Sequence, residues 1–229
     1  IVPAGALVAE TENGDLVAAL EKEKAKLRSL EEGTRPEDIQ VSKVAVQNAK
    51  NDVVNDIKNG YVNADDAIRN KVDQFISNPK SLMPQFNFAV SNSQLKTDIE
   101  IGRIIMESSL VSWNDSISSF TNTPDMTRAI GEAKANLRAA QSYLDKIALA
   151  INPLTPSSTL SQTTIDSYKA AVVLARTNVT DALGAVTASE EDLRNAESAL
   201  ALKEAGSTEA DIDAQKAAVR AAEASLLKT

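Results

Sequence analysis

The residues of this sequence that could do chemistry are its carboxylates, serines and lysines, because the chain contains no histidine and no cysteine. The missing histidine removes the commonest general base and the commonest metal ligand. The missing cysteine removes disulfides, thiolate metal sites and cysteine nucleophiles. A Ser–Lys pair could still act as a nucleophile, and Lys80 lies beside Ser81. Such neighbours arise by chance in a serine-rich loop, so we assign them no catalytic role.

Adjacent carboxylates could support acid–base chemistry, and they occur as the pairs 31–32, 65–66 and 190–191. These pairs are more typical of a solvated helix face or of a first helical turn. A di-iron carboxylate bundle would need Glu-x-x-His on paired helices, which this sequence cannot supply. It also lacks a phosphate loop, a dinucleotide fingerprint and an HExxH motif. We therefore predict no catalytic, cofactor or metal site.

Composition favours closely packed helices over an enzyme cleft. Hydrophobic residues make up 43% of the 229 residues, but aromatic residues only 3%. The formal net charge of -8 disfavours nucleic acid and anionic membranes, because phosphate binding needs clustered Lys and Arg. No run approaches the roughly 18 apolar residues that span a bilayer, and the start shows no signal-peptide pattern. We expect a soluble piece of a longer protein.

Helix signals follow this composition along most of the chain. We expect an extended segment over residues 1–12, then helices over about 15–32 and from about 34 as far as 77. Capping signals at Ser91 and Thr123 start the next two helices. Trp113 falls in the apolar stripe of the first of these and is expected in the core. A long helix of about 40 residues follows from about 162, and the last helix ends near residue 227.

The predicted fold class is all-α. It is a long antiparallel, coiled-coil-like helical hairpin with a four-helix-bundle insertion and a short extended N-terminal segment. The expected organisation is a strand remnant at 1–12, an ascending broken helix at 13–58, the bundle at 59–185 and a descending broken helix at 186–229.

The two helix breaks share one pattern, in which a glycine stops a helix and a Ser/Thr–acid cluster starts the next. Thr34-x-x-Glu37 predicts a capping box after the first break, and Thr208-x-x-Asp211 predicts the helix start after the second. The apolar spacing after each break is also shared: Ile39, Val46, Ala49 and Val53 match Ile212, Val219, Ala222 and Leu226. A break that occurs twice, with the rest of the chain between its copies, indicates a hairpin. One broken helix would run out, and its partner would run back beside it. The candidate joint residues are Gly33, Thr34, Arg35, Pro36, Glu37, Gly206, Ser207, Thr208 and Asp211.

These residues carry a resemblance to a known family. Residues 30–39 resemble the broken-helix joint of HlyD-type periplasmic adaptors, also called membrane fusion proteins, and residues 202–212 resemble the returning joint. Residues 3–9 are similar to the last strand of the first lipoyl half-motif, and residues 221–229 resemble the helix end that leads into the second. The bundle at 59–185 departs from the plain hairpin of the family.

The resemblance implies a non-catalytic adaptor subunit of an efflux or export system. Its helical arm would act as spacer and docking arm at the extracytoplasmic face of the cell envelope, in the periplasm, with a membrane anchor outside this chain. The implied partners are an inner-membrane transporter, ABC-type or ion-driven, and like subunits in the full-length protein; this fragment itself is expected to be monomeric. An outer-envelope channel is an optional partner: Arg176 and Leu183 fit the Arg–Leu–Ser docking pattern, but Glu190 replaces its serine.

Other classes compete with the adaptor. A helical sensor or ligand-binding bundle of a cell-envelope protein would have a pocket between the helices near Trp113. A structural coiled coil of the cell surface is a third class, although the two proline-marked loops favour a compact insert. An enzyme comes last, because the usual catalytic residues are absent.

Overall fold

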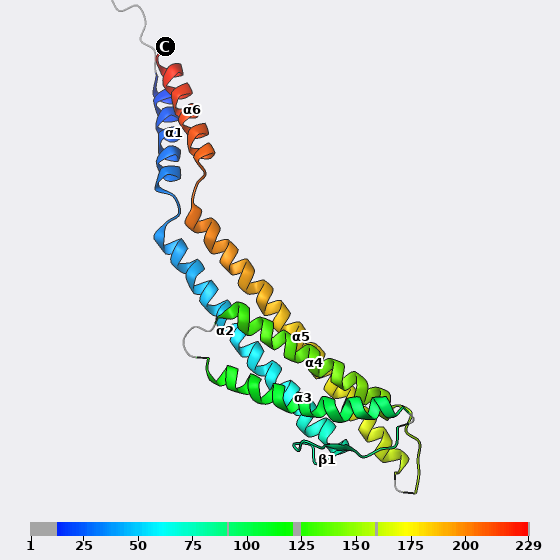
Figure 1. Cartoon of the computed structure of the whole chain (residues 1–229). Helices are drawn as coiled ribbons and strands as arrows, with labels where there is room; N and C mark the ends of the chain where they lie inside the picture. The colour runs from blue at the N-terminus through cyan, green and yellow to red at the C-terminus, as the bar shows by residue number, and fades with distance from the viewer. Residues whose placement is uncertain (1–12, 91, 121–124, 159, 229) are drawn as a thin grey trace, which may run out of the picture. The chain divides into compact units, whose positions relative to one another are not determined.

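A computed structural model describes residues 13–90, 92–120, 125–158 and 160–228, and it confirms the all-α class (Figure 1). The expected strand remnant at 1–12 lies outside the described residues. The helices are α1 (Gly14–Glu32), α2 (Pro36–Asp65), α3 (Ser93–Ser118), α4 (Met126–Ile151), α5 (Gln162–Ala205) and α6 (Glu209–Leu226). No helix among the described residues is both long enough and apolar enough to cross a membrane.

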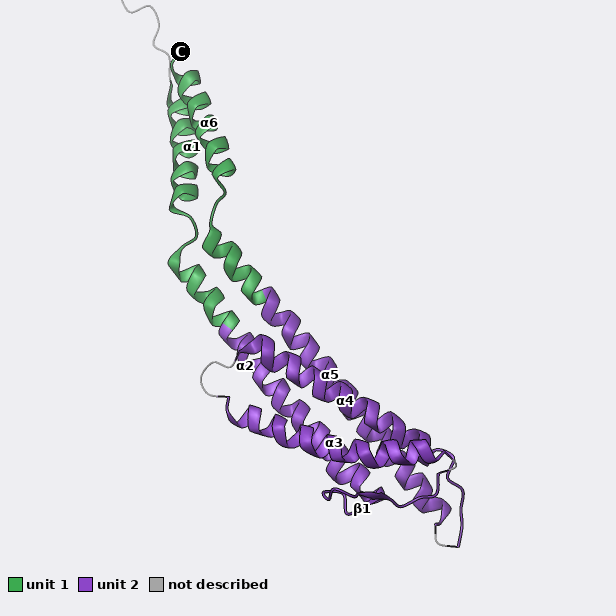
Figure 2. Ribbon diagram, viewed as in Figure 1, with its two compact units in different colours: residues 1–46, 196–229 green, residues 47–195 purple. Residues whose placement is uncertain are grey.

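The chain divides into two compact units (Figure 2). Unit 1 contains residues 1–46 and 196–229, and unit 2 contains residues 47–195. The equivalent borders predicted from the sequence are at residues 58/59 and 185/186. Unit 2 therefore includes about three more helical turns of α2, and about three more of α5, than the predicted bundle.

In unit 1, α6 runs back along α1. The Gln215 Nε2 group donates hydrogen bonds to the backbone oxygen of Glu23 (3.0 Å) and to its carboxylate (2.7 Å). The buried apolar side chains of the described part of this unit are Leu20, Val46 and Val219. Unit 1 is thus held by a narrow seam and a few polar contacts, as expected of paired helices without a third layer.

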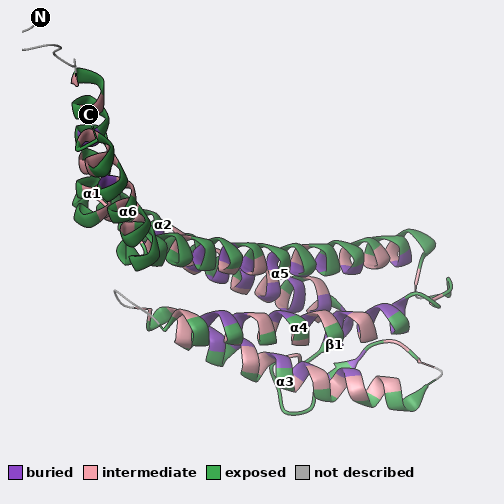
Figure 3. Ribbon diagram, turned by 90° about the horizontal axis from the view of Figure 1, so that it is seen from above, coloured by how far each residue is buried: buried purple, intermediate pink, exposed green. Residues whose placement is uncertain are grey.

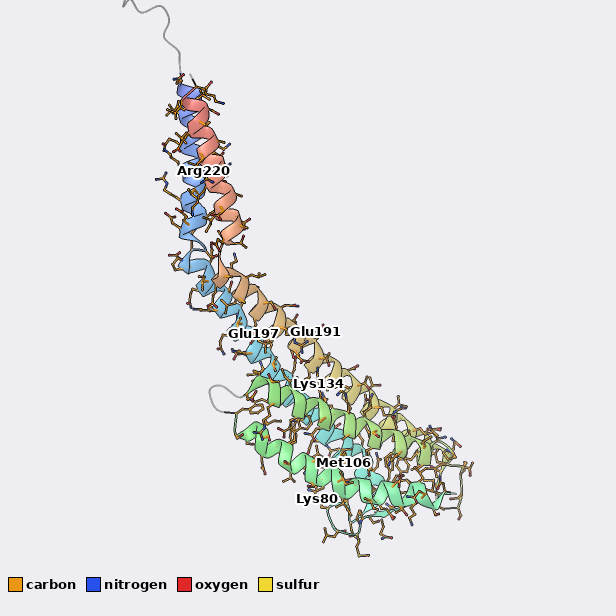
Figure 4. The ribbon with its side chains drawn as sticks, turned by 45° about the horizontal axis from the view of Figure 1, so that its top comes forward. Lys80, Met106, Lys134, Glu191, Glu197 and Arg220 are labelled. Atoms are coloured by element: carbon orange, nitrogen blue, oxygen red, sulfur yellow. The ribbon has the colours of Figure 1, made fainter. Side chains whose placement is uncertain are left out.

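Unit 2 contains the larger core, which is built from the inner faces of its helices (Figure 3). Apolar residues with a three–four spacing form the buried face of α4: the buried set includes Ile130, Ala133, Leu137, Ala140, Leu144, Ile147 and Ile151. The buried residues of α5 in this unit follow the same rhythm: Ile165, Val172, Ala175, Val179, Ala182, Val186, Ser189 and Leu193. Helix α3 contributes Met106, which is labelled in Figure 4, and Trp113 to this core.

Helices α3 and α4 approach closely at one glycine. A Cβ atom on Gly102 would lie only 2.8 Å from the ring of Tyr143, so this position of α3 has no room for a side chain. The Tyr143 hydroxyl donates a hydrogen bond to the backbone oxygen of Ile99 (3.2 Å). Burial raises the pKa of Tyr143 above its usual value, so the phenol stays protonated and keeps this donor.

The prediction that the second helix continues to residue 77 is wrong. Helix α2 ends at Asp65 and passes into a π-helical segment, η1 (Asp66–Val72), and a 3₁₀ turn, η2 (Asp73–Phe75). Two short antiparallel strands follow, β1 (Ile76–Ser77) and β2 (Gln85–Phe86). Sequence patterns missed these strands because two residues are too few to show a period of two.

Two helix starts also differ from the prediction. Asn92, not Ser91, caps α3, because its side chain accepts hydrogen bonds from the backbone N–H groups of Gln94 and Leu95. Asp125, not Thr123, caps α4 by accepting from the N–H group of Arg128. Asn and Asp are as good N-caps as Ser and Thr, so in each case a nearby Asn or Asp is the N-cap residue in place of the predicted one.

Candidate functional site

The helix breaks of unit 1 bring the two candidate joint glycines together. Gly33 ends α1 with φ 70° and ψ -155°, and Gly206 follows α5 with φ 65°. A Cβ atom on Gly206 would lie 3.9 Å from the Cα atom of Gly33. Positive φ values are open to glycine at little cost, and other residues adopt them with strain. Two backbone positions that favour glycine therefore lie beside each other, one on each of the two neighbouring helical segments.

The helix after the second break begins as predicted. Thr208 caps α6: its hydroxyl accepts from the N–H group of Asp211 (3.2 Å), and the Asp211 carboxylate accepts from the N–H group of Thr208 (3.3 Å). This reciprocal pair is the capping box expected from the Thr-x-x-Asp spacing. Ser207 lies between the glycine and the cap and is half-buried. The helix start is thus fixed within one turn of the glycine.

The helix after the first break begins one residue later than predicted. Helix α2 begins at Pro36, and the backbone oxygen of Arg35 accepts from the N–H groups of Asp38 (3.0 Å) and Ile39 (3.2 Å). The cap position therefore belongs to Arg35, and the predicted capping box from Thr34 to Glu37 is wrong. The reason is Pro36, because proline fits the first helical position best, where its missing N–H group is not needed.

The remaining groups of this joint are electrostatically simple. The acids of the first turn of α2, such as Glu37, favour the positive end of the helix dipole. Lys43 Nζ lies 3.5 Å from Glu204 Oε1 and links the start of α2 to the end of α5. Arg35 is exposed, and the described part of the structure gives its guanidinium no ion-pair partner. The described contacts of this joint are therefore helix ends, helix starts and a surface ion pair.

A second arrangement, in unit 2, was not predicted from the sequence. Arg103 of α3 is fully buried, and its guanidinium makes a two-pronged ion pair with Asp73, at 2.6 Å from Nε and 2.8 Å from Nη2. Its third nitrogen, Nη1, donates to Glu107 (2.9 Å). Every nitrogen of this buried cation is therefore satisfied by a carboxylate, as a buried charge requires.

The network continues from Glu107 to the start of the π-helical segment. Arg69 donates to Glu107 (2.8 Å) and to Asp65 (2.7 Å). Burial alone would raise the pKa of Glu107, but the hydrogen bonds from Arg69 and Arg103 outweigh it and hold this pKa below its usual value. Asp65 and Asp73 flank η1 on its two sides. Helix α3 holds Asp73 through Arg103, and it holds Arg69, the partner of Asp65, through Glu107.

The other chemical candidates have structural roles. The Ser81 hydroxyl accepts a hydrogen bond from the N–H group of Met83 (3.1 Å) within the turn between the strands. Glu190 pairs with Lys134 and Arg194, and its neighbour Glu191 is exposed (Figure 4). No group of three or more metal-ligating side chains that could hold an ion occurs among the described residues.

Trp113 lies in the core, as predicted. Its side chain is 1% exposed, and its ring meets the ring of Tyr61 edge-on with centroids 5.6 Å apart. The three described pockets are lined by other residues. The tryptophan therefore acts as a packing residue between α2 and α3.

Comparison with known proteins adds no relative: no protein-family model, no curated protein and no solved structure matches this chain. The features that bear on function are the joint of unit 1 and the side chains of unit 2.

Proposed function

We propose that this chain is the helical arm of an HlyD-type adaptor, a non-catalytic subunit that spaces and docks the parts of an efflux or export system. The observation that carries the proposal is the pair of facing helix breaks at Gly33 and Gly206. Each break has its own glycine with a positive φ and its own helix start. The two helical segments that carry these breaks run in opposite directions.

The mechanism is mechanical. A helix cannot propagate through a glycine at φ 70° and ψ -155°, because this conformation lies outside the helical region. Two breaks at one level let both strands change course together, while the capping box of Thr208 prevents the next helix from fraying. In this proposal the joint sets the course of the helices of unit 1, and the ion-pair network stabilises unit 2.

The proposal includes partners and a location. The full-length protein would bind an inner-membrane transporter and like subunits at the extracytoplasmic face of the membrane, with its anchor outside this chain. The net charge of -8 supports protein partners over nucleic acid, since phosphate backbones would be repelled.

The first test is the parent reading frame. We expect a membrane anchor and a lipoyl half-motif upstream, and the matching half followed by a β-barrel downstream. A frame that begins and ends near this segment, or that continues into a signalling module, would contradict the adaptor.

The second test is export by the full-length protein in its own host. Gly33→Val should abolish or strongly reduce export, because a β-branched residue is strained at this positive φ. Gly184→Ala is the matched control, since this glycine lies inside α5 with a normal helical backbone and with open space where a Cβ atom would lie. Full export by the Gly33→Val protein would remove the joint from the mechanism.

A further inference from the structure

Unit 2 contains a pocket that the adaptor proposal does not use. It has a volume of about 560 Å³, within the range of about 300–1,000 Å³ that is typical of small-molecule sites. Its walls come from η2, from the chain that follows β2, from the connection between α4 and α5, and from the start of α5. Segments far apart in the sequence therefore converge on one hollow.

Two aromatic rings form one part of its wall. Phe88 and Tyr168 are half-buried, and their ring centroids lie 5.8 Å apart. Each ring rests on a buried one: Tyr168 on Phe75 at 4.9 Å, and Phe88 on Phe86 at 5.5 Å. The buried rings fix the two half-buried ones, so the aromatic surface exists before any ligand arrives.

The polar part of the wall is uncharged. Its polar lining residues include Gln74, Asn87 and Thr155, and no charged residue among the described ones lines the pocket. The Asn87 oxygen accepts a hydrogen bond from the Ser77 hydroxyl (2.7 Å), which orients the amide and leaves its NH₂ group as a donor. A charged ligand would lose its hydration without gaining a counter-charge, so this wall favours a neutral one.

We propose that this pocket binds a neutral saccharide. A sugar ring has an apolar face of C–H groups, which fits the rings of Phe88 and Tyr168, and a rim of hydroxyls. Asn87 offers its NH₂ group as a donor. Gln74 offers its amide oxygen as an acceptor, because its Nε2 donates to the backbone oxygen of Lys71. Together with the hydroxyl of Thr155, which can donate and accept, these residues can match the hydroxyls of a sugar. The joint of unit 1 plays no part in this site, and the site can exist whether or not the chain is an adaptor.

Saturation-transfer NMR on the full 229-residue chain tests the proposal with maltotriose and tri-N-acetylchitotriose as probes. We expect transfer to at least one of them, with a Kd in the millimolar range or tighter. Ala89→Trp fills the pocket and should weaken binding at least about tenfold. Thr155→Val keeps the shape, removes the hydroxyl and should weaken binding about two- to tenfold.

Ala135→Trp is the matched control, because Ala135 is also an exposed alanine that lines a different hollow of unit 2. It should leave saccharide binding unchanged. Absence of transfer to both probes at about 10 mM, or equal binding by the Ala89→Trp and wild-type chains, would overturn the proposal. Binding of the neutral aromatic N-phenyl-1-naphthylamine without either saccharide would overturn it too, since the pocket would then select an apolar ligand.

Discussion

Replacing Arg103 with methionine tests whether the buried ion-pair network holds unit 2 together. The change keeps an unbranched side chain of similar length, so most apolar packing survives, but it removes the guanidinium. Asp73 then loses its ion-pair partner and Glu107 loses one of two, while their side chains are only 12% and 22% exposed.

The expected cost follows from that burial. Removing one partner of a buried pair typically costs about 3–5 kcal/mol, because the remaining charge stays buried without compensation. The two carboxylates keep some contact with water, and Glu107 keeps Arg69, so we expect a loss near the lower end, about 3 kcal/mol. Adding Asp73→Asn to Arg103→Met should recover part of this loss, since an amide is cheaper to bury than a carboxylate.

Urea unfolding followed by Trp113 fluorescence measures the effect, because this single tryptophan is buried in unit 2. Arg176→Met is the control: Arg176 pairs with Asp145, but both side chains are nearly half exposed, so the loss should be about 0–1 kcal/mol. If Arg103→Met costs no more than Arg176→Met, the network is not a stabilising element and the reasoning fails.

Three further predictions address acid sensitivity and the glycines. Because the pKa of Glu107 is lower in the folded state, its contribution to stability is present above about pH 4.5 and is lost as the pH falls through the folded pKa; Glu107→Gln should flatten this acid limb of the urea-midpoint curve, and an unchanged limb would contradict the assignment. Gly33→Ala should cost about 1–3 kcal/mol in thermal unfolding, whereas Gly184→Ala should stabilise by about 0.5–1 kcal/mol; equal effects would show that the positive φ is not enforced. Gly102→Ala should cost about 1–3 kcal/mol by urea unfolding, since its Cβ would overlap a neighbouring ring, and a neutral result would mean that α3 and α4 can separate there.

The helices could be predicted from the sequence because each carries a local signal. The long helix expected from about residue 162 is α5, Gln162–Ala205, and the capping box of Thr208 lies where the spacing placed it. Such features depend on residues three or four positions apart and need no tertiary contact. Helix starts were less exact, because several neighbouring residues could serve as the cap.

The ion-pair network could not be predicted in the same way, because its members are far apart in the sequence. Arg103 and Asp73 are separated by 30 residues, and Arg69 and Glu107 by 38. One signal did exist: Arg103 falls between Ile99 and Met106 in the three–four rhythm of buried positions on α3. An arginine at such a position predicts a buried cation, and a buried cation requires carboxylates on the facing element.

The duplicated helix break is a stronger argument for a built joint than either break alone. Glycine, Ser/Thr and acids end and start helices in many proteins, so one break indicates only local chemistry. In unit 1, however, the glycine of one strand lies against the glycine of the other, 173 residues later in the chain. If only one of the two helical segments were broken, the other would continue as a straight helix. The two segments could then pack together on one side of the break, as Leu20 and Val219 do, but they would separate on the other side. Two breaks at one level are what a paired arm needs to turn as a unit, which is why this feature carries the proposed function.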